Sequence, residues 1–236
     1  CIDLVMHVKG LDLLSASQYL ADKAGIPWPV NGRVQAEEWE EQQALYSLYT
    51  TVAEIYNKKL DDTHLKLLLE KWGLTAETAR KYLFGFAPGG NFISEKLLEL
   101  GFTDDIIFKS GLVNGGRFDV FNKRLVFPYW SRGKVVYFIA RRIEGITPNN
   151  EYEKAKFKKL PVYDERSRPY ISKAVSNEFF AGEDTALGAG ELIITEGIAD
   201  CYSALQAGFN CISPVTTSFR EADWPKLARL SKEAET

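Results

Sequence analysis

The sequence predicts an α+β fold, and three observations support this prediction. About the first 110 residues are a succession of helical patterns separated by breaks. Two strand-like runs, RLVFPYW and KVVYFIARR, then flank a Ser-Arg-Gly turn, which is typical of a β-hairpin. Residues 191–236 read as strand, helix, strand and helix, the order of a parallel α/β unit. We therefore expect leading helices, a mixed α/β subdomain and the start of an α/β domain.

The first part of the chain is predicted to be helical. Residues 2–24 read as a short amphipathic helix, a loop near Gly10 and a second helix, with Ser15 as its N-cap and Gly25 as its stop. The Pro- and Gly-containing IPWPVNGR predicts a boundary. A long helix is expected from about Glu37 to Leu60. Its apolar residues recur at steps of three and four: Leu45, Leu48, Tyr49, Val52, Ile55, Tyr56 and Leu60.

Four shorter helices are expected before the hairpin. DDTHLKLLLEKWG begins with capping residues and ends at Gly73, and Thr75 caps the helix that follows. FGFAPGGNF breaks the pattern, after which SEKLLELG and TDDIIFKSG are each closed by a glycine.

After the hairpin, TPNNEYEKAKFKKLPVYDERSRPY is polar and basic and predicts a loop with short extended pieces. Residues 191–195 predict a buried strand and residues 198–208 a helix ended by Gly208. NCISPV predicts the next strand, and EADWPKLARLSKEA the next helix.

Composition narrows the class of protein. The chain has 236 residues, of which 45% are hydrophobic and 26% charged, as in ordinary globular proteins. It contains no apolar run of eighteen residues and no basic leader with a cleavage signal, so we expect no membrane association. Its three cysteines show neither metal-site spacing nor an even disulfide framework, which favours a reduced, cytoplasmic setting. Cys201 and Cys211 are expected as buried small hydrophobes, and His7 and His64 as structural residues.

Charge is unevenly distributed. The net charge is −3, yet residues 117–173 contain 14 Lys and Arg against 6 Asp and Glu, a local net charge of +8. The remainder of the chain then has a net charge of −11. This segregation predicts a basic surface for nucleic acid, and the alternative is a solvated face without a partner.

LIITEGIADCYSALQAGF raises a question about two acids. Glu196 follows an apolar run, and Asp200 comes four residues later. One interpretation is that both acids only favour the positive start of the next helix. The other is a metal-carboxylate site for phosphoryl chemistry at the carboxyl end of a strand, with Gly197 allowing close backbone approach.

The chain resembles bacterial-type (DnaG-like) DNA primases. ITEGIADCYSALQAGF is similar to the first motif of their Toprim domain, and FDVFNKRLVFPYW is similar to their Asn-x-Arg-(apolar)-x-Phe-Pro signature. LEKWGLTAETARKYLFGFAP, GKVVYFIARR and CIDLVMHVKGLDLLSASQYLADKAGI resemble, respectively, the entry to the primase core, a strand ending in Arg and the helical tail of the zinc-binding domain. The motifs occur in the order of the family and cover nearly the whole chain.

The resemblance implies roles for individual residues. Glu196 and Asp200 match acids that are catalytic and bind metal, here Mg²⁺ or Mn²⁺. Arg124, Arg141 and Lys156 match basic residues that line the groove for template and nucleotide phosphates. Looser candidates for nucleic-acid contact are Arg142, Lys158 and Lys173. Each of these basic residues has the alternative of being a solvated surface charge.

The resemblance also implies a domain plan and a function. We expect a helical zinc-domain tail at 1–27, a helical connector at 28–75, a basic primase-core subdomain at 76–185 and a partial Toprim domain at 186–236. The expected function is RNA primer synthesis on single-stranded DNA from ribonucleotides, and a replicative helicase is a further candidate partner. Zinc is expected only in an N-terminal domain outside these residues. No Asp-x-Asp occurs before Thr236, so we expect the metal site to be incomplete and these residues alone to be inactive.

Several positions depart from the family pattern. Trp72 stands where a basic residue often precedes the glycine, and Tyr137, Ile139 and Ala140 replace smaller residues, which predicts a bulkier surface there. TTSF replaces a Gly-Thr-Ala-Leu pattern. These departures favour a divergent member of phage or mobile-element type. The alternatives are a Toprim nuclease or topoisomerase-like enzyme, which would lack NKRLVFPYW, and a non-catalytic single-stranded-DNA-binding module.

Overall fold

The computed structural model describes residues 2–11, 13–24, 36–186, 189–215 and 218–232. The chain divides into two compact units. Unit 1 comprises residues 1–43, 130–133 and 180–236, and unit 2 comprises residues 44–129 and 134–179. The predicted boundary at IPWPVNGR lies outside the described residues.

Unit 2 combines helices with a four-stranded sheet of order β1-β2-β3-β4. The elements from α3 to β4 are α3 (Ala36–Asn57), α4 (Asp62–Trp72), α5 (Ala76–Lys81), β1 (Gly85–Ala87), α6 (Phe92–Glu99), α7 (Asp104–Lys109), β2 (Arg124–Ser131), β3 (Lys134–Arg142) and β4 (Phe157–Lys159). The start of α3 and the tip of the β2–β3 hairpin are counted with unit 1. This mixture confirms the predicted α+β class.

The predicted helix signals in unit 2 are confirmed. Asp61 caps α4 by accepting a hydrogen bond from the His64 backbone N–H, and Gly73 ends the helix in the left-handed conformation. Thr75 caps α5 in the same way. His64 is buried in this capping box and stacks on Phe86, so its role is structural, as predicted.

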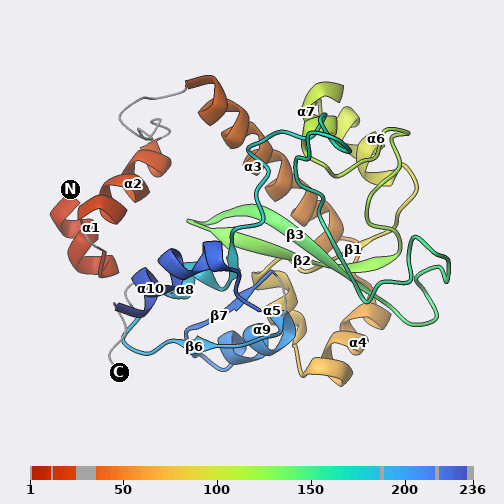
Figure 1. Ribbon diagram of the computed structural model, residues 1–236. Helices are drawn as coiled ribbons and strands as arrows, with labels where there is room; N and C mark the ends of the chain where they lie inside the picture. Colours follow the sequence, from red (N-terminus) through yellow and green to blue (C-terminus); the bar gives the residue numbers. More distant parts are fainter. Residues whose placement is uncertain (1, 12, 25–35, 187–188, 216–217, 233–236) are drawn as a thin grey trace. The chain divides into compact units, whose positions relative to one another are not determined.

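The long helix α3 supplies one side of the core. Leu45, Leu48, Tyr49, Val52 and Tyr56, five of the residues predicted from the spacing, are fully buried. Figure 1 shows α3 along one face of the β2–β3 hairpin and α4 at the other. Ring contacts agree, because the Tyr49 ring meets Phe138 on β3 and the Trp72 ring meets Phe127 on β2.

The hairpin forms where the sequence predicts it. Arg132 and Gly133, between β2 and β3, have φ values of 54° and 73°. Two consecutive positive φ angles match the right-handed twist of a tight hairpin, and the glycine adopts this conformation without strain. Tyr137, Ile139 and Ala140 are buried, so the prediction of a bulkier surface there is wrong. The Tyr137 hydroxyl donates to the Leu160 carbonyl and joins β3 to the end of β4.

Unit 1 combines helices with a three-stranded sheet of order β5-β7-β6. Its elements are α1 (Ile2–Lys9), α2 (Leu13–Ala24), β5 (Phe180–Ala181), α8 (Glu183–Ala186), β6 (Ile193–Ile194), α9 (Ile198–Gln206), β7 (Cys211–Pro214), η1 (Glu221–Asp223) and α10 (Trp224–Lys232). α2 begins before Ser15, so Ser15 is not its N-cap. Cys201 and Cys211 are buried, as expected.

The β6-α9-β7 unit confirms the predicted parallel arrangement, since Ile193 pairs with Cys211 and Ile194 with Ile212. One detail differs. The strand predicted as buried over residues 191–195 is only two residues long, and Ile193 and Ile194 are 39% and 48% exposed. Within the described sheet β6 is an edge strand with β7 as its neighbour, so its apolar side chains lack a second strand beside them.

Among the described residues, no helix is both long and apolar enough to cross a membrane.

Candidate nucleic-acid interface and acidic helix start

The predicted basic residues of β3 and β4 divide between two faces of the sheet. Arg141 lies opposite Phe157 and Ala140 lies opposite Lys158 in the antiparallel register. Opposed residues in such a ladder share a face, and successive residues alternate between faces. Arg141 therefore lies on the face that Trp72 covers, whereas Arg142 and Lys158 lie on the other face.

The Arg141 guanidinium lies against two aromatic rings. Its guanidinium carbon lies 4.8 Å from the centroid of the Trp72 ring and 4.9 Å from that of Phe157. The Nε atom is buried and has no hydrogen-bond partner among the described residues. Desolvation by burial lowers the pKa of Arg141, although an arginine remains charged in proteins. Rings orient a guanidinium without neutralising it, so Arg141 retains donors for an anion.

Arg124 is fully buried, which makes direct contact with nucleic acid incompatible with its position in the structure. Its Nε donates to Glu153 Oε2 at 2.8 Å, and its Nη atoms donate to the carbonyl oxygens of Glu153 and Ala155. A buried guanidinium requires such partners because removing the charge from water is costly. We conclude that Arg124 organises the loop before β4 instead of offering its charge to a phosphate.

Glu153 links Arg124 to a second predicted residue. Its Oε1 accepts a hydrogen bond from Lys158 Nζ at 2.7 Å, and the Lys158 side chain remains 28% exposed. Lys158 is therefore partly exposed, and its ion pair with the buried Glu153 fixes its position.

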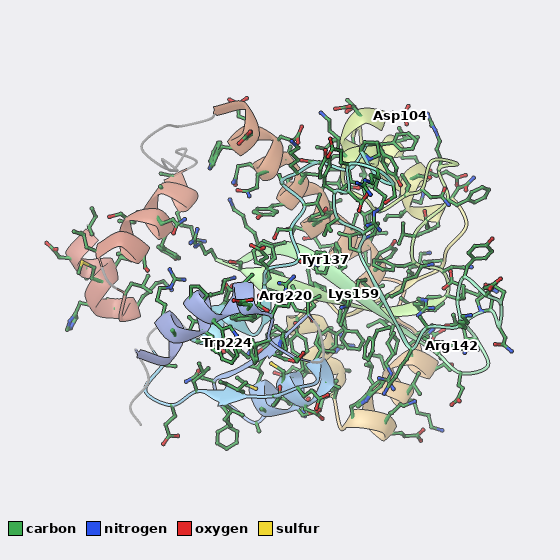
Figure 2. All side chains as sticks on the ribbon, viewed as in Figure 1. Asp104, Tyr137, Arg142, Lys159, Arg220 and Trp224 are labelled. Atoms are coloured by element: carbon green, nitrogen blue, oxygen red, sulfur yellow. The ribbon has the colours of Figure 1, made fainter. Side chains whose placement is uncertain are left out.

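The remaining basic residues are nearer to solvent. Arg142 is half-buried and donates to Asn149 Oδ1 at 3.1 Å, and its backbone N–H bonds to the carbonyl of Lys156, whose side chain is exposed. Figure 2 shows Arg142 at the end of β3 and Lys159 further back along the sheet, because β4 runs antiparallel to β3. Lys173 lies on a later loop, where its Nζ is 5.3 Å from the Tyr163 ring. The structure thus joins Arg142, Lys156 and Lys158 at one strand pair.

The two predicted acids lie in unit 1, around the start of α9. Glu196 and Asp200 are both exposed. A Cβ added at Gly197 would lie 2.6 Å from Asp200 Oδ2, so the absence of a side chain at 197 lets the Asp200 carboxylate fold back over the helix start. The backbone beneath is fixed by hydrogen bonds from Thr195 N–H to the Ile212 carbonyl and from Ser213 Oγ to the Glu196 carbonyl. The described residues contain no group of three or more His, Cys, Asp and Glu able to hold a metal.

Comparison with known proteins identifies the family. Residues 53–163 match the family described as DNA primase catalytic core, N-terminal domain. The DNA primase of Clostridium acetobutylicum is 30% identical over 243 residues, which cover 97% of this chain and 37% of the relative. The chain belongs to the DnaG-like DNA primases. It spans a little over a third of the length of this primase.

Solved primase structures have the same fold. The RNA polymerase domain of Mycobacterium tuberculosis primase DnaG, in complex with double-stranded DNA, has a TM-score of 0.66 at 25% identity. The match covers 80% of this chain and 60% of that one. A DnaG primase catalytic domain bound to single-stranded DNA has a TM-score of 0.60 at 24% identity, covering 83% of this chain and 60% of that chain. The match to the primase core family, over residues 53–163, includes the NKRLVFPYW stretch, which the nuclease and topoisomerase alternative would lack.

Sequence reasoning missed several residues that shape this region. Glu153 lies 29 positions from Arg124 in a loop without periodicity, so no spacing rule connects the two. Trp72 is conspicuous as a departure from the primase pattern, and the structure explains it as one of the two rings that hold Arg141. Phe157 is the other ring, and its place opposite Arg141 depends on the β3–β4 register.

Proposed function

We propose that this chain is part of an enzyme that synthesises short RNA primers on single-stranded DNA during DNA replication. The observation that carries the proposal is Arg141, a charged guanidinium that lies against the rings of Trp72 and Phe157 and has a buried, unpaired Nε. It lies within the segment that matches the primase core, and the relative with 30% identity is named a DNA primase.

The basic residues bind phosphate in this proposal. Arg141 offers two adjacent donors on a rigid strand, the geometry that suits bidentate contact with a phosphate. Arg142, Lys156 and Lys158 form a second set on and beside β3 and β4, and Lys173 is a more distant candidate. Because Arg141 lies on a different sheet face from Arg142 and Lys158, we assign the two sets to different phosphates, one from the template strand and one from a ribonucleotide.

Glu196 and Asp200 contribute metal ligands in the proposal. Exposed carboxylate oxygens are the donors that Mg²⁺ or Mn²⁺ prefers, so the residues present fit such an ion as two members of its ligand shell. When bound, two such ions supply activation of the attacking hydroxyl and stabilisation of the leaving pyrophosphate. The contribution of this chain is to hold both carboxylates at the start of one helix, where the absence of a side chain at Gly197 leaves room for the Asp200 carboxylate.

The domain plan remains part of the proposal. The parallel β6-α9-β7 unit, with Glu196 two residues after the end of β6, supports 186–236 as the first part of a Toprim domain. We retain 1–27 as the tail of a zinc-binding region, 28–75 as a connector and 76–185 as the core subdomain. A replicative helicase and ribonucleotides are the further partners that this role implies.

Salt dependence of DNA binding tests the proposal. Fluorescence anisotropy with a labelled oligothymidylate should show affinity falling roughly ten- to a thousand-fold between 50 and 200 mM salt, because a handful of phosphate contacts release counterions. The joint substitution Arg141→Ala, Arg142→Ala and Lys156→Ala should flatten this dependence. The matched control removes three surface lysines that each pair with an acid: Lys66, Lys96 and Lys109. Equal effects of the two triple variants would contradict the proposal.

A further inference from the structure

Unit 2 contains a cavity of about 510 Å³ beside the Glu153–Lys158 ion pair. Four loop segments and β4 surround it, contributing Gly90, Phe118, Asn122, Tyr152, Lys158 and Tyr170 among its lining residues. Its volume lies within the range of pockets that bind small organic groups.

Three aromatic rings on this cavity are open to solvent. Phe118 is 55% exposed, Tyr152 84% and Tyr170 39%. Large aromatic side chains ordinarily contribute their area to a core or to an interface. Three exposed rings around one cavity therefore indicate a binding site for a flat, apolar group.

Side-chain hydrogen bonds fix the backbone turns that bear Phe118 and Tyr152. Asn114 Oδ1 accepts hydrogen bonds from the backbone N–H groups of Gly116 and Phe118, at 2.9 and 3.1 Å. Asn150 Oδ1 accepts from the backbone N–H groups of Tyr152 and Glu153, both at 3.0 Å. Fixing these turns before binding reduces the conformational entropy that a ligand must remove.

The polar groups of the cavity suit the edge of a heterocycle. Asn122 and Asn150 bring side-chain amides to the lining. Both amides contain N–H donors, while Asn150 Oδ1 already accepts from two backbone N–H groups. Lys158 is fixed at the cavity by its ion pair with Glu153. The same segment bears the exposed Lys154 and Lys156 beside Tyr152, which places positive charge where a phosphate backbone would continue.

We propose that this cavity binds a base of single-stranded DNA, stacked on the rings of Phe118 and Tyr152. Aromatic faces, amide edges and neighbouring cations together match a nucleobase joined to phosphates, whereas a neutral sugar would not use the cations. The proposal rests on the proposed function, because it places part of the template strand on this chain. The proposed function describes contacts with phosphates only, and this cavity would add a contact with a base.

Two ring substitutions test the cavity. Anisotropy titrations of the whole 236-residue chain with labelled oligothymidylate should show Tyr152→Ala and Phe118→Ala each weakening binding by about five- to a hundred-fold. Tyr152→Phe keeps the ring and should bind like the unmodified chain. Phe209→Ala is the matched control, since Phe209 is also 55% exposed but lies in unit 1, and it should leave affinity unchanged. Melting temperatures establish that each variant is folded.

Two further readouts separate stacking from charge. The slope of log affinity against log salt should be the same in both ring variants, because no cation is removed. A strand with abasic sites should bind the unmodified chain more weakly, and Tyr152→Ala should then cause no further loss.

The outcomes distinguish the cavity from the function. If both ring variants bind like the unmodified chain while loss of Arg141, Arg142 and Lys156 weakens binding, the cavity proposal is wrong and the proposed function stands. If the unmodified chain binds no single-stranded DNA, both proposals fail. If ATP alone occupies the cavity and the abasic strand binds as well as the normal one, the base belongs to a free nucleotide and the assignment to the strand is overturned.

Discussion

The guanidinium carbon of Arg141 lies 4.8 Å from the centre of the Trp72 ring, although 69 positions separate the two residues in the chain. The Phe157 ring centre lies 4.9 Å from the same carbon. An ion pair would orient the guanidinium equally well but would cancel its charge. Two rings orient it and leave the charge available, which is the property that a phosphate contact requires.

Loss of the Trp72 ring should weaken binding to DNA. Trp72→Ala frees the Arg141 side chain, and a cation–π contact of about 0.5–2 kcal/mol corresponds to roughly two- to thirty-fold in affinity. Trp72→Phe should retain most of the affinity, because a ring remains. Anisotropy titrations with single-stranded DNA measure the effect, and Trp224→Ala, which removes an exposed Trp from unit 1, serves as the control. Unaltered affinity in Trp72→Ala would show that the ring only packs against Phe127.

Breaking the buried Arg124–Glu153 pair should destabilise the protein. Arg124→Met leaves Glu153 with one cation and leaves two carbonyl oxygens without donors, so the free energy of unfolding should fall by about 3–5 kcal/mol. Combining it with Glu153→Leu should recover part of the loss. Urea denaturation measures both variants, with Arg142→Met as the control on the neighbouring strand. A stable Arg124→Met variant that no longer binds DNA would instead show that Arg124 reaches the nucleic acid.

Asp119 should make stability depend on pH. Burial raises its pKa to about 7, against opposing hydrogen bonds from the backbone N–H groups at the start of α6. The folded pKa exceeds the unfolded value of about 4, so the folded state binds more protons between these values. Stability should therefore fall as pH rises from about 4 to about 7, by roughly 4 kcal/mol, and level off above.

Asp119→Asn tests this dependence. The amide oxygen can still accept from the Ile93 N–H, but the group no longer titrates. Urea denaturation at pH 5 and pH 8 should show a smaller difference for the variant than for the unmodified chain. An identical difference in the two proteins would assign the pH dependence to other groups.

Glu196 should matter for chemistry and little for folding. The residue is exposed, so Glu196→Gln should change the free energy of unfolding by no more than about 0.5 kcal/mol. In a polypeptide of the length of its primase relatives, primer synthesis should collapse, with partial recovery in excess Mg²⁺ or Mn²⁺. Glu191→Gln, another exposed acid of the same segment, should remain active. Full activity of Glu196→Gln with a small loss of stability would leave only the helix-start interpretation.

Much of the fold follows from local patterns in the sequence. The apolar spacing of α3, the caps of α4 and α5 and the two-residue hairpin turn are properties of neighbouring residues, and the structure confirms them. The parallel β6-α9-β7 unit follows from the order of its elements. Such features depend on backbone geometry that a short stretch of sequence determines by itself.

The candidate site was less predictable because its residues depend on distant partners. A basic residue in a strand has the same local pattern whether its partner is a phosphate or an internal carboxylate, and Arg124 has the latter. An apolar run predicts burial, but the exposure of β6 depends on what lies beside it in the sheet. The rings around the cavity come from separate loops, and no periodicity connects them.

Because side chains alternate along β3, the number of residues before each arginine decides which face of the sheet it occupies. Arg141 and Arg142 are chemically identical and adjacent, and they differ in role because one occupies an odd place in the strand and the other an even place. Deleting a single residue between Lys134 and Arg141 would exchange the two, turning the second arginine toward Trp72 and the first toward the face of Lys158. The strand therefore tolerates substitution more readily than the loss or gain of one residue, because the position of each arginine along the strand decides which face it occupies.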